Sequence, residues 1–246
     1  MEDKQKIENS WEIPVIIPCF LEGANAQLLH EEVSKQWENY PIVTNNVWYS
    51  ERANAVIGSH PFYIAAANKV FRKSGLLLVT ATTRDTKSII ESGLDLEGKV
   101  IDLTLVLKTY GDSYKPNDYI AKDLARQLGK RNIDFSESAP AVIQLTNVDI
   151  RIDGSSTCGL SFDLRGDAVI IQAEQLIDEN NKKMFSEYNK WGMPIFDKKG
   201  KRQLWTRKDG LSRVSLLGRG GILDASGYDL WASGHRGRVV LMKGVA

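Results

Sequence analysis

The chain has 246 residues, of which 42% are hydrophobic and 26% are charged, as in globular proteins large enough for one or two hydrophobic cores. Its 32 Lys and Arg nearly balance its 31 Asp and Glu, so the net charge of +1 excludes a uniformly basic or acidic protein. No stretch approaches the roughly 18 apolar residues that span a bilayer, and the first residues lack the apolar run of a secretory signal. We therefore expect a cytoplasmic protein with no membrane partner.

Three segments in the first half of the chain have the periodicity of amphipathic helices. In residues 25–39 the apolar side chains fall on one side at close to helical spacing. A second helix is expected to begin at Ser59 as its N-cap, with Pro61 in the first turn. A third is expected to begin at its cap Asn117 and to end before Gly129, which is a natural C′ residue.

Alternating apolar and polar residues predict strands in much of the remaining sequence up to residue 190. Residues 101–108 alternate most regularly, so we expect Asp102, Thr104 and Lys108 on a face of the sheet that is open to solvent. Four further strands are expected at 141–145, 148–153, 160–164 and 168–171. The prediction for residues 1–190 is an α+β body with about three helices and a mostly antiparallel sheet.

Glycine-rich turns dominate the chain after about residue 191, where helical periodicity disappears. Ten of the 20 glycines fall in the last 66 residues. Turn signals occur at 197–200, 207–210, 218–221, 224–227 and 234–237, and strands are expected between them at 201–206, 211–217, 222–223, 228–232 and 238–243. This pattern predicts a glycine-rich β-meander over residues 191–246, as a small second domain or an extension of the main sheet.

The charge is distributed unevenly along the chain. Residues 181–246 hold 14 Lys and Arg against 5 Asp and Glu, whereas residues 1–180 hold 18 against 26. An asymmetry of this kind favours a polyanionic partner for the basic end, or contact between the basic end and an acidic protein surface.

Alternate turns of a meander share one end of the sheet, which predicts that the first, third and fifth turns form a basic patch. Lys and Arg on glycine-rich turns can reach phosphates, and an exposed aromatic ring beside them can stack a base. The residues predicted to bind nucleic acid are therefore Lys198, Lys199, Lys201, Arg202, Trp205, Arg219, Arg236 and Arg238. Trp231 is expected on a strand adjoining that of Trp205.

The sequence contains few candidates for catalysis. His235 lies in a basic turn where it could move a proton, and Asp163 is one of the acidic residues of the central strands that could hold a divalent metal. The others in that set are Asp102, Asp149, Asp153 and Asp167. The two cysteines have no metal-binding spacing, and no nucleotide-binding motif is present, so no metal site and no cofactor are assigned.

Three functions remain open on these observations. The first is a nucleic-acid-binding protein that contacts phosphates through its basic C-terminal β region, alone or as a subunit of a larger assembly. The second is a non-catalytic structural subunit, such as a homo-oligomer, in which the acidic body pairs with the basic end. The third is a metal-dependent nuclease. The sequence favours a protein that is not an enzyme.

Overall fold

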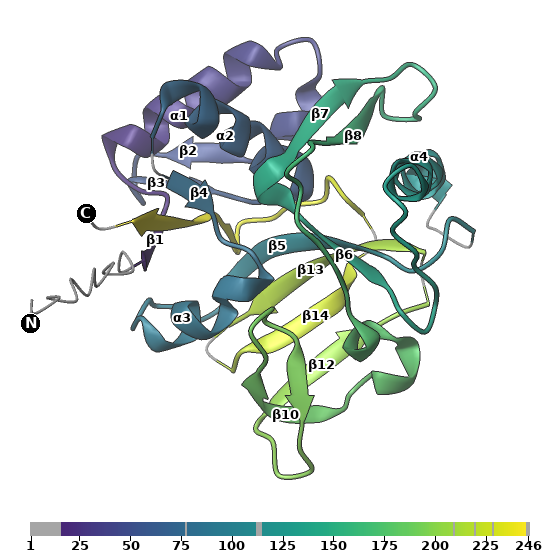
Figure 1. Ribbon diagram of the computed structural model, residues 1–246. Helices are drawn as coiled ribbons and strands as arrows, with labels where there is room; N and C mark the ends of the chain where they lie inside the picture. The colour runs from purple at the N-terminus through teal and green to yellow at the C-terminus, as the bar shows by residue number, and fades with distance from the viewer. Residues whose placement is uncertain are drawn as a thin grey trace, which may run out of the picture.

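The computed structural model describes residues 16–76, 78–111, 115–208, 210–218, 220–227 and 229–244. The fold is α+β, as predicted (Figure 1). The helices in these ranges are α1 Ala24–Gln36, α2 Pro61–Ser74, α3 Thr86–Glu91 and α4 Asp118–Gly129, with short 3-10 turns at Pro41–Thr44, Thr83–Asp85, Lys115–Asn117, Leu145–Asn147, Glu174–Leu176 and Asp178–Asn180. Within these same ranges, no helix has the length and apolar character needed to cross a bilayer.

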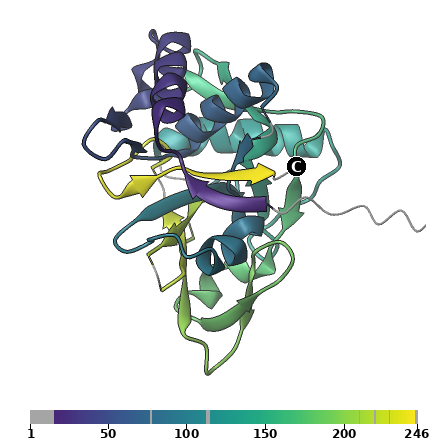
Figure 2. The same cartoon turned by 90° about the vertical axis from the view of Figure 1, so that its left-hand side faces the viewer.

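The strands form one large sheet, one small sheet and a hairpin. They are β1 Ile16–Phe20, β2 Trp48–Ser50, β3 Ala55–Ile57, β4 Leu78–Thr80, β5 Val100–Leu107, β6 Ala141–Gln144, β7 Val148–Ile152, β8 Leu160–Leu164, β9 Ile170–Gln172, β10 Met184–Tyr188, β11 Pro194–Phe196, β12 Arg202–Thr206, β13 Leu211–Leu217, β14 Ile222–Gly227, β15 Gly237–Arg238 and β16 Val240–Gly244. The main sheet has the order β11-β10-β12-β14-β13-β5-β15-β3-β2, with β6 also beside β5 and β9 beside β6. The small sheet is β1-β16-β4, which crosses the middle of the molecule in Figure 2, and the hairpin is β7-β8.

The three predicted helices correspond to α1, α2 and α4, but the N-cap of α2 is not Ser59. The cap residue is His60, whose Nδ1 accepts a hydrogen bond from the backbone N–H of Tyr63 at 3.3 Å. Ser59 instead donates from its hydroxyl to Asp102. The short helix α3 was not predicted, since six residues are too few to show a helical period.

The strands after residue 191 are not connected as a simple meander. β12 and β14 pair in parallel, whereas an up-and-down meander makes only antiparallel neighbours. The predicted turn at 224–227 lies inside β14, and residues 229–232 of the predicted fourth strand form a turn. β13 pairs with β5 and β16 pairs with β1, so strands from both predicted segments share the same sheets.

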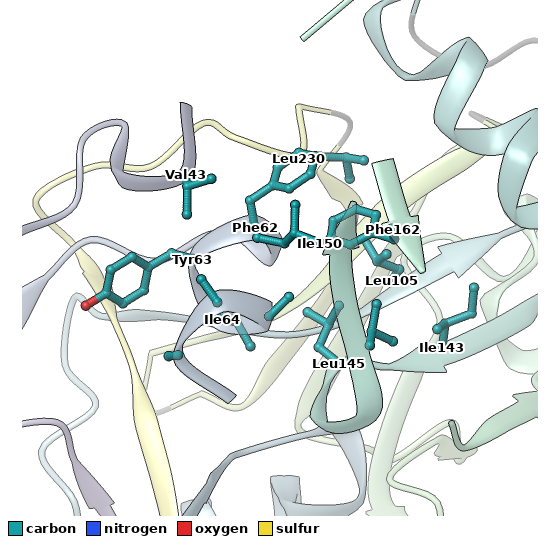
Figure 3. Close-up of a cluster of buried hydrophobic side chains, with 14 of the residues drawn as sticks. Val43, Phe62, Tyr63, Ile64, Leu105, Ile143, Leu145, Ile150, Phe162 and Leu230 are labelled. Atoms are coloured by element: carbon teal, nitrogen blue, oxygen red, sulfur yellow. The ribbon is translucent and has the colours of Figure 1, made fainter. Parts of the chain in front are cut away.

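The main sheet separates two hydrophobic cores, because Leu105 and Leu107 of β5 point to one face and Val106 to the other. The first core lies under α1, α2, α4 and the β7-β8 hairpin, where Phe62 stacks on Phe162 with ring centroids 4.5 Å apart (Figure 3). The second core includes Phe185, Leu204 and Ile89 of α3. The sheet is therefore covered on both sides along β5.

The double cover explains why the predicted solvent face of β5 is wrong. Asp102 is 3% exposed, Thr104 is fully buried and Lys108 is 2% exposed. Alternation in this strand divides apolar from polar side chains, but both sets lie inside the protein. A buried carboxylate is costly without hydrogen-bond partners, which directs attention to the surroundings of Asp102.

Candidate nucleic-acid interface

The strand register places three turns at one end of the main sheet. Leu204 of β12 pairs with Leu223 of β14, and Leu223 with Leu216 of β13. The same row continues through β5 to Arg238 of β15. The segments that precede β12, β14 and β15 therefore end at the same edge, about 19 Å across its four strand spacings. We call residues 197–202, 218–221 and 234–238 the rim; its Arg219 lies outside the described residues.

The first turn of the rim presents three exposed lysines. Asp197 shapes the turn, because its carboxylate accepts the backbone N–H of Lys199 at 3.0 Å and its carbonyl accepts that of Gly200 at 2.9 Å. A side chain at Gly200 would lie 2.4 Å from the backbone nitrogen of Phe185, so the glycine lets the turn pack against β10. The exposed cations Lys198, Lys199 and Lys201 project from this anchored turn.

Arg202 plays a different part from these lysines. Its Nη1 donates to the carbonyl of Ser186, and its guanidinium lies 5.7 Å from the ring centroid of Tyr188. Tyr188 in turn donates from its hydroxyl to the carbonyl of Gly221, at 3.0 Å. Arg202 therefore ties β10 and the 218–221 turn together rather than standing free in solvent.

The third turn carries His235 and Arg236, which are both exposed. Two backbone hydrogen bonds fix this turn, since Gly237 N–H donates to Gly234 and Val100 N–H donates to Arg236. Arg238 folds back on the turn and donates from Nη1 to the carbonyls of His235 and Gly237, at 2.8 and 2.7 Å. Arg236 is therefore the cation of this turn that is presented outward.

A cavity of about 210 Å³ opens beside the third turn. Its lining includes Ser59, Asp102, Arg213, His235 and Arg236. The carboxylate of Asp102 is already engaged at both oxygens. It accepts the hydroxyl of Ser59 at 2.6 Å and that of Ser215 at 2.7 Å, and Arg213 Nε lies 3.4 Å away. Asp102 thus lines this cavity as a structural group, because both of its oxygens already accept hydrogen bonds.

Trp205 is an exposed residue of β12, next to the rim. It is 36% exposed, and Lys182 Nζ lies 5.6 Å from the centroid of its ring. Register puts Trp205 in one row with Asp224, Ser215 and Asp102, and this row is exposed at Trp205 and buried at Ser215 and Asp102. Trp231 lies in a turn and packs against Phe62 with centroids 6.3 Å apart, so it is not on an adjoining strand as expected.

The two candidate catalytic residues lie apart. His235 lines the cavity at the rim, whereas Asp163 lies on the β7-β8 hairpin and lines a separate cavity. Asp149 and Asp153, also proposed as metal ligands, are paired with arginines. Within the described ranges, no group of three or more His, Cys, Asp or Glu is arranged to hold a metal ion.

No protein-family model, curated protein or solved structure matches this chain. The chemistry of the rim therefore has to be judged from its own residues. Sequence reasoning missed the roles of Ser59, Arg213 and Ser215 around Asp102. No local pattern marks them, because they come from three separate segments of the chain.

Proposed function

We propose that this chain binds single-stranded nucleic acid across the rim and the adjoining face of the main sheet. The observation that carries the proposal is the register of β12, β14 and β15, which brings the basic turns to one edge. Lys198, Lys199, Lys201 and Arg236 contact phosphates in this proposal, and Trp205 stacks a base. Trp205 is four residues from Lys201, so the nearest of the two kinds of contact are about 13 Å apart along the chain.

The exposed ring favours a single strand over a duplex. A base can stack on a protein side chain only after it leaves its own helical stack, and single strands offer such bases without cost of unpairing. The cations of the first turn are on flexible side chains, which suits contacts that do not depend on sequence.

Replacing Lys198, Lys199 and Lys201 together with Ala is expected to weaken binding to a labelled oligonucleotide at low salt. Three lost phosphate contacts should also reduce the slope of log K against log salt by about 2, since each contact to a single strand contributes about 0.7. Fluorescence anisotropy over a salt series measures both quantities.

The matched control replaces Lys35, Lys73 and Lys122, three exposed lysines of α1, α2 and α4. It removes the same net charge and should leave the slope near that of the wild type. Equal losses in the two triple variants would contradict the proposal. A change in light scattering with salt, without any oligonucleotide binding, would instead support the assembly subunit in which acidic and basic surfaces pair.

Trp205→Ala is expected to cost about 1–3 kcal/mol of binding free energy if a base stacks on the ring. Trp205→Phe keeps an aromatic face and should retain much of the affinity. The same oligonucleotide titration measures both variants. A loss of affinity that is equal for Phe and Ala would show that stacking is not the contact made there.

A further inference from the structure

A second cavity, of about 260 Å³, lies between the end of α4 and the β7-β8 hairpin. Four of its seven lining residues are cations, namely Arg126, Lys130, Arg131 and Arg151, and Asp163 is the one carboxylate among them. Cations are concentrated here although the first 180 residues carry an excess of acidic side chains. Like charges repel, so such a cluster needs a structural reason or a ligand.

The arginines of this cavity are held by carboxylates and carbonyls, and Arg151 Nη2 donates to Asp153 at 2.8 Å as well as to Asp123. Asp123 of α4 is 5% exposed, and it accepts Arg126 Nη2 at 2.5 Å and Arg151 Nη2 at 2.8 Å. The hydroxyl of Ser161 donates to the same carboxylate at 2.8 Å. Arg131 is held in a similar way, through Nη2, by the carbonyls of Leu164 and Arg165.

The guanidinium groups have hydrogen-bond donors that make no hydrogen bond to the described residues. In the part of the chain that the structure describes, the side-chain hydrogen bonds of Arg126, Arg131 and Arg151 all run through Nη2. Each group has five N–H donors in a rigid fork, so the donors of Nε and Nη1 are left for another acceptor. Lys130 is exposed at the end of α4 and adds a mobile ammonium.

We propose that this cavity binds the phosphate group of a small molecule. Forked guanidinium donors match the oxygens of a phosphate, and several cations around one group suit a dianion. The volume is slightly below the roughly 300 Å³ at which pockets for drug-sized ligands begin, which fits inorganic phosphate, pyrophosphate or a small phosphate ester.

This site is separate from the rim. The cavity beside the third turn of the rim and the cavity beside α4 share no lining residue. None of the cations proposed to contact nucleic acid lines the second cavity, so each proposal can fail without the other.

The test is calorimetric titration of the full chain with inorganic phosphate, pyrophosphate and glycerol 3-phosphate at low salt. We expect saturable binding of one molecule per chain, and the ranking of the three probes separates free phosphate from a phosphate ester. Lys130→Gln should weaken binding about tenfold, since it removes a charged donor from the cavity. Lys130 is exposed, so the variant is expected to keep its fold.

The matched control is Lys122→Gln, which removes an exposed lysine two turns earlier on α4 that does not line the cavity. It should leave the affinity for all three probes unchanged. The proposal is overturned if the wild type binds none of the probes saturably, or if Lys122→Gln weakens binding as much as Lys130→Gln, because the effect would then come from overall charge alone.

Discussion

Asp102→Ala is expected to lower the free energy of unfolding by about 3–5 kcal/mol, the cost of breaking a buried ion pair from one side. Asp102 accepts hydrogen bonds from Ser59 and Ser215 and faces Arg213, whose side chain is 17% exposed. Without the carboxylate, two hydroxyls lose an acceptor and a guanidinium is left largely buried without its counter-charge. Urea unfolding followed by circular dichroism measures the change, with comparable m-values as the check that the compared states are the same.

The double variant Asp102→Leu with Arg213→Met separates charge from packing. It removes both members of the ion pair, and pairs replaced together by apolar groups often cost little. We expect the double variant to be more stable than Asp102→Ala alone. The single variant Arg213→Met completes the comparison. If the double variant loses as much stability as the two single variants together, the stability of this region comes from packing and not from the pairing of the Asp102 and Arg213 charges.

Stability is expected to fall as the pH is lowered from about 6.5 toward 3 because of His60. The imidazole is fully buried at the start of α2, and burial, followed by the charge of Arg213, lowers its pKa to about 3. In the unfolded chain the pKa of a histidine is about 6.5. Between these values the unfolded state binds a proton that the folded state excludes, so stability is lost at about 1.4 kcal/mol per pH unit as the pH falls.

His60→Asn tests this pH dependence while keeping the helix cap. Asn is a preferred N-cap residue and can accept the backbone N–H of Tyr63. Urea unfolding at a series of pH values from 7 to 4 should give a shallower decline for the variant than for the wild type. Parallel curves would mean that carboxylates, and not His60, set the acid sensitivity.

Local patterns in the sequence predicted elements well where they depend on neighbouring residues. The apolar spacing of α4 and its final Gly129 marked the helix, and β13 has the predicted bounds of Leu211–Leu217. The solvent face of β5 failed for a different reason. Whether Asp102 meets water or Ser215 depends on a strand more than 100 residues later, which alternation within β5 cannot reveal.

In the candidate sites, too, the sequence revealed the features that depend on neighbouring residues and missed those that depend on contacts between distant segments. The sequence marked the cations and glycines of the turns, because both are local features, and the register puts the segments before β12, β14 and β15 at one edge. The connectivity differs from the prediction. The turns were expected to share an edge through the antiparallel strands of a meander, whereas they share it because β12 and β14 pair in parallel. The arginine cavity beside Asp163 was missed, because Arg126 and Arg151 meet only through the buried Asp123.

The small sheet has a consequence for synthesis of the protein. β16 lies between β1 and β4, and Ile16 pairs with Gly244. A ribosome adds about 5–20 residues per second, so roughly ten to thirty seconds pass between completion of β4 and the appearance of β16. Throughout that interval β1 and β4 lack their partner strand in the small sheet, and unpaired backbone edges can pair with other chains. The nascent chain is therefore exposed to aggregation through these edges until β16 is made, and a chaperone that shields β1 would act in that interval.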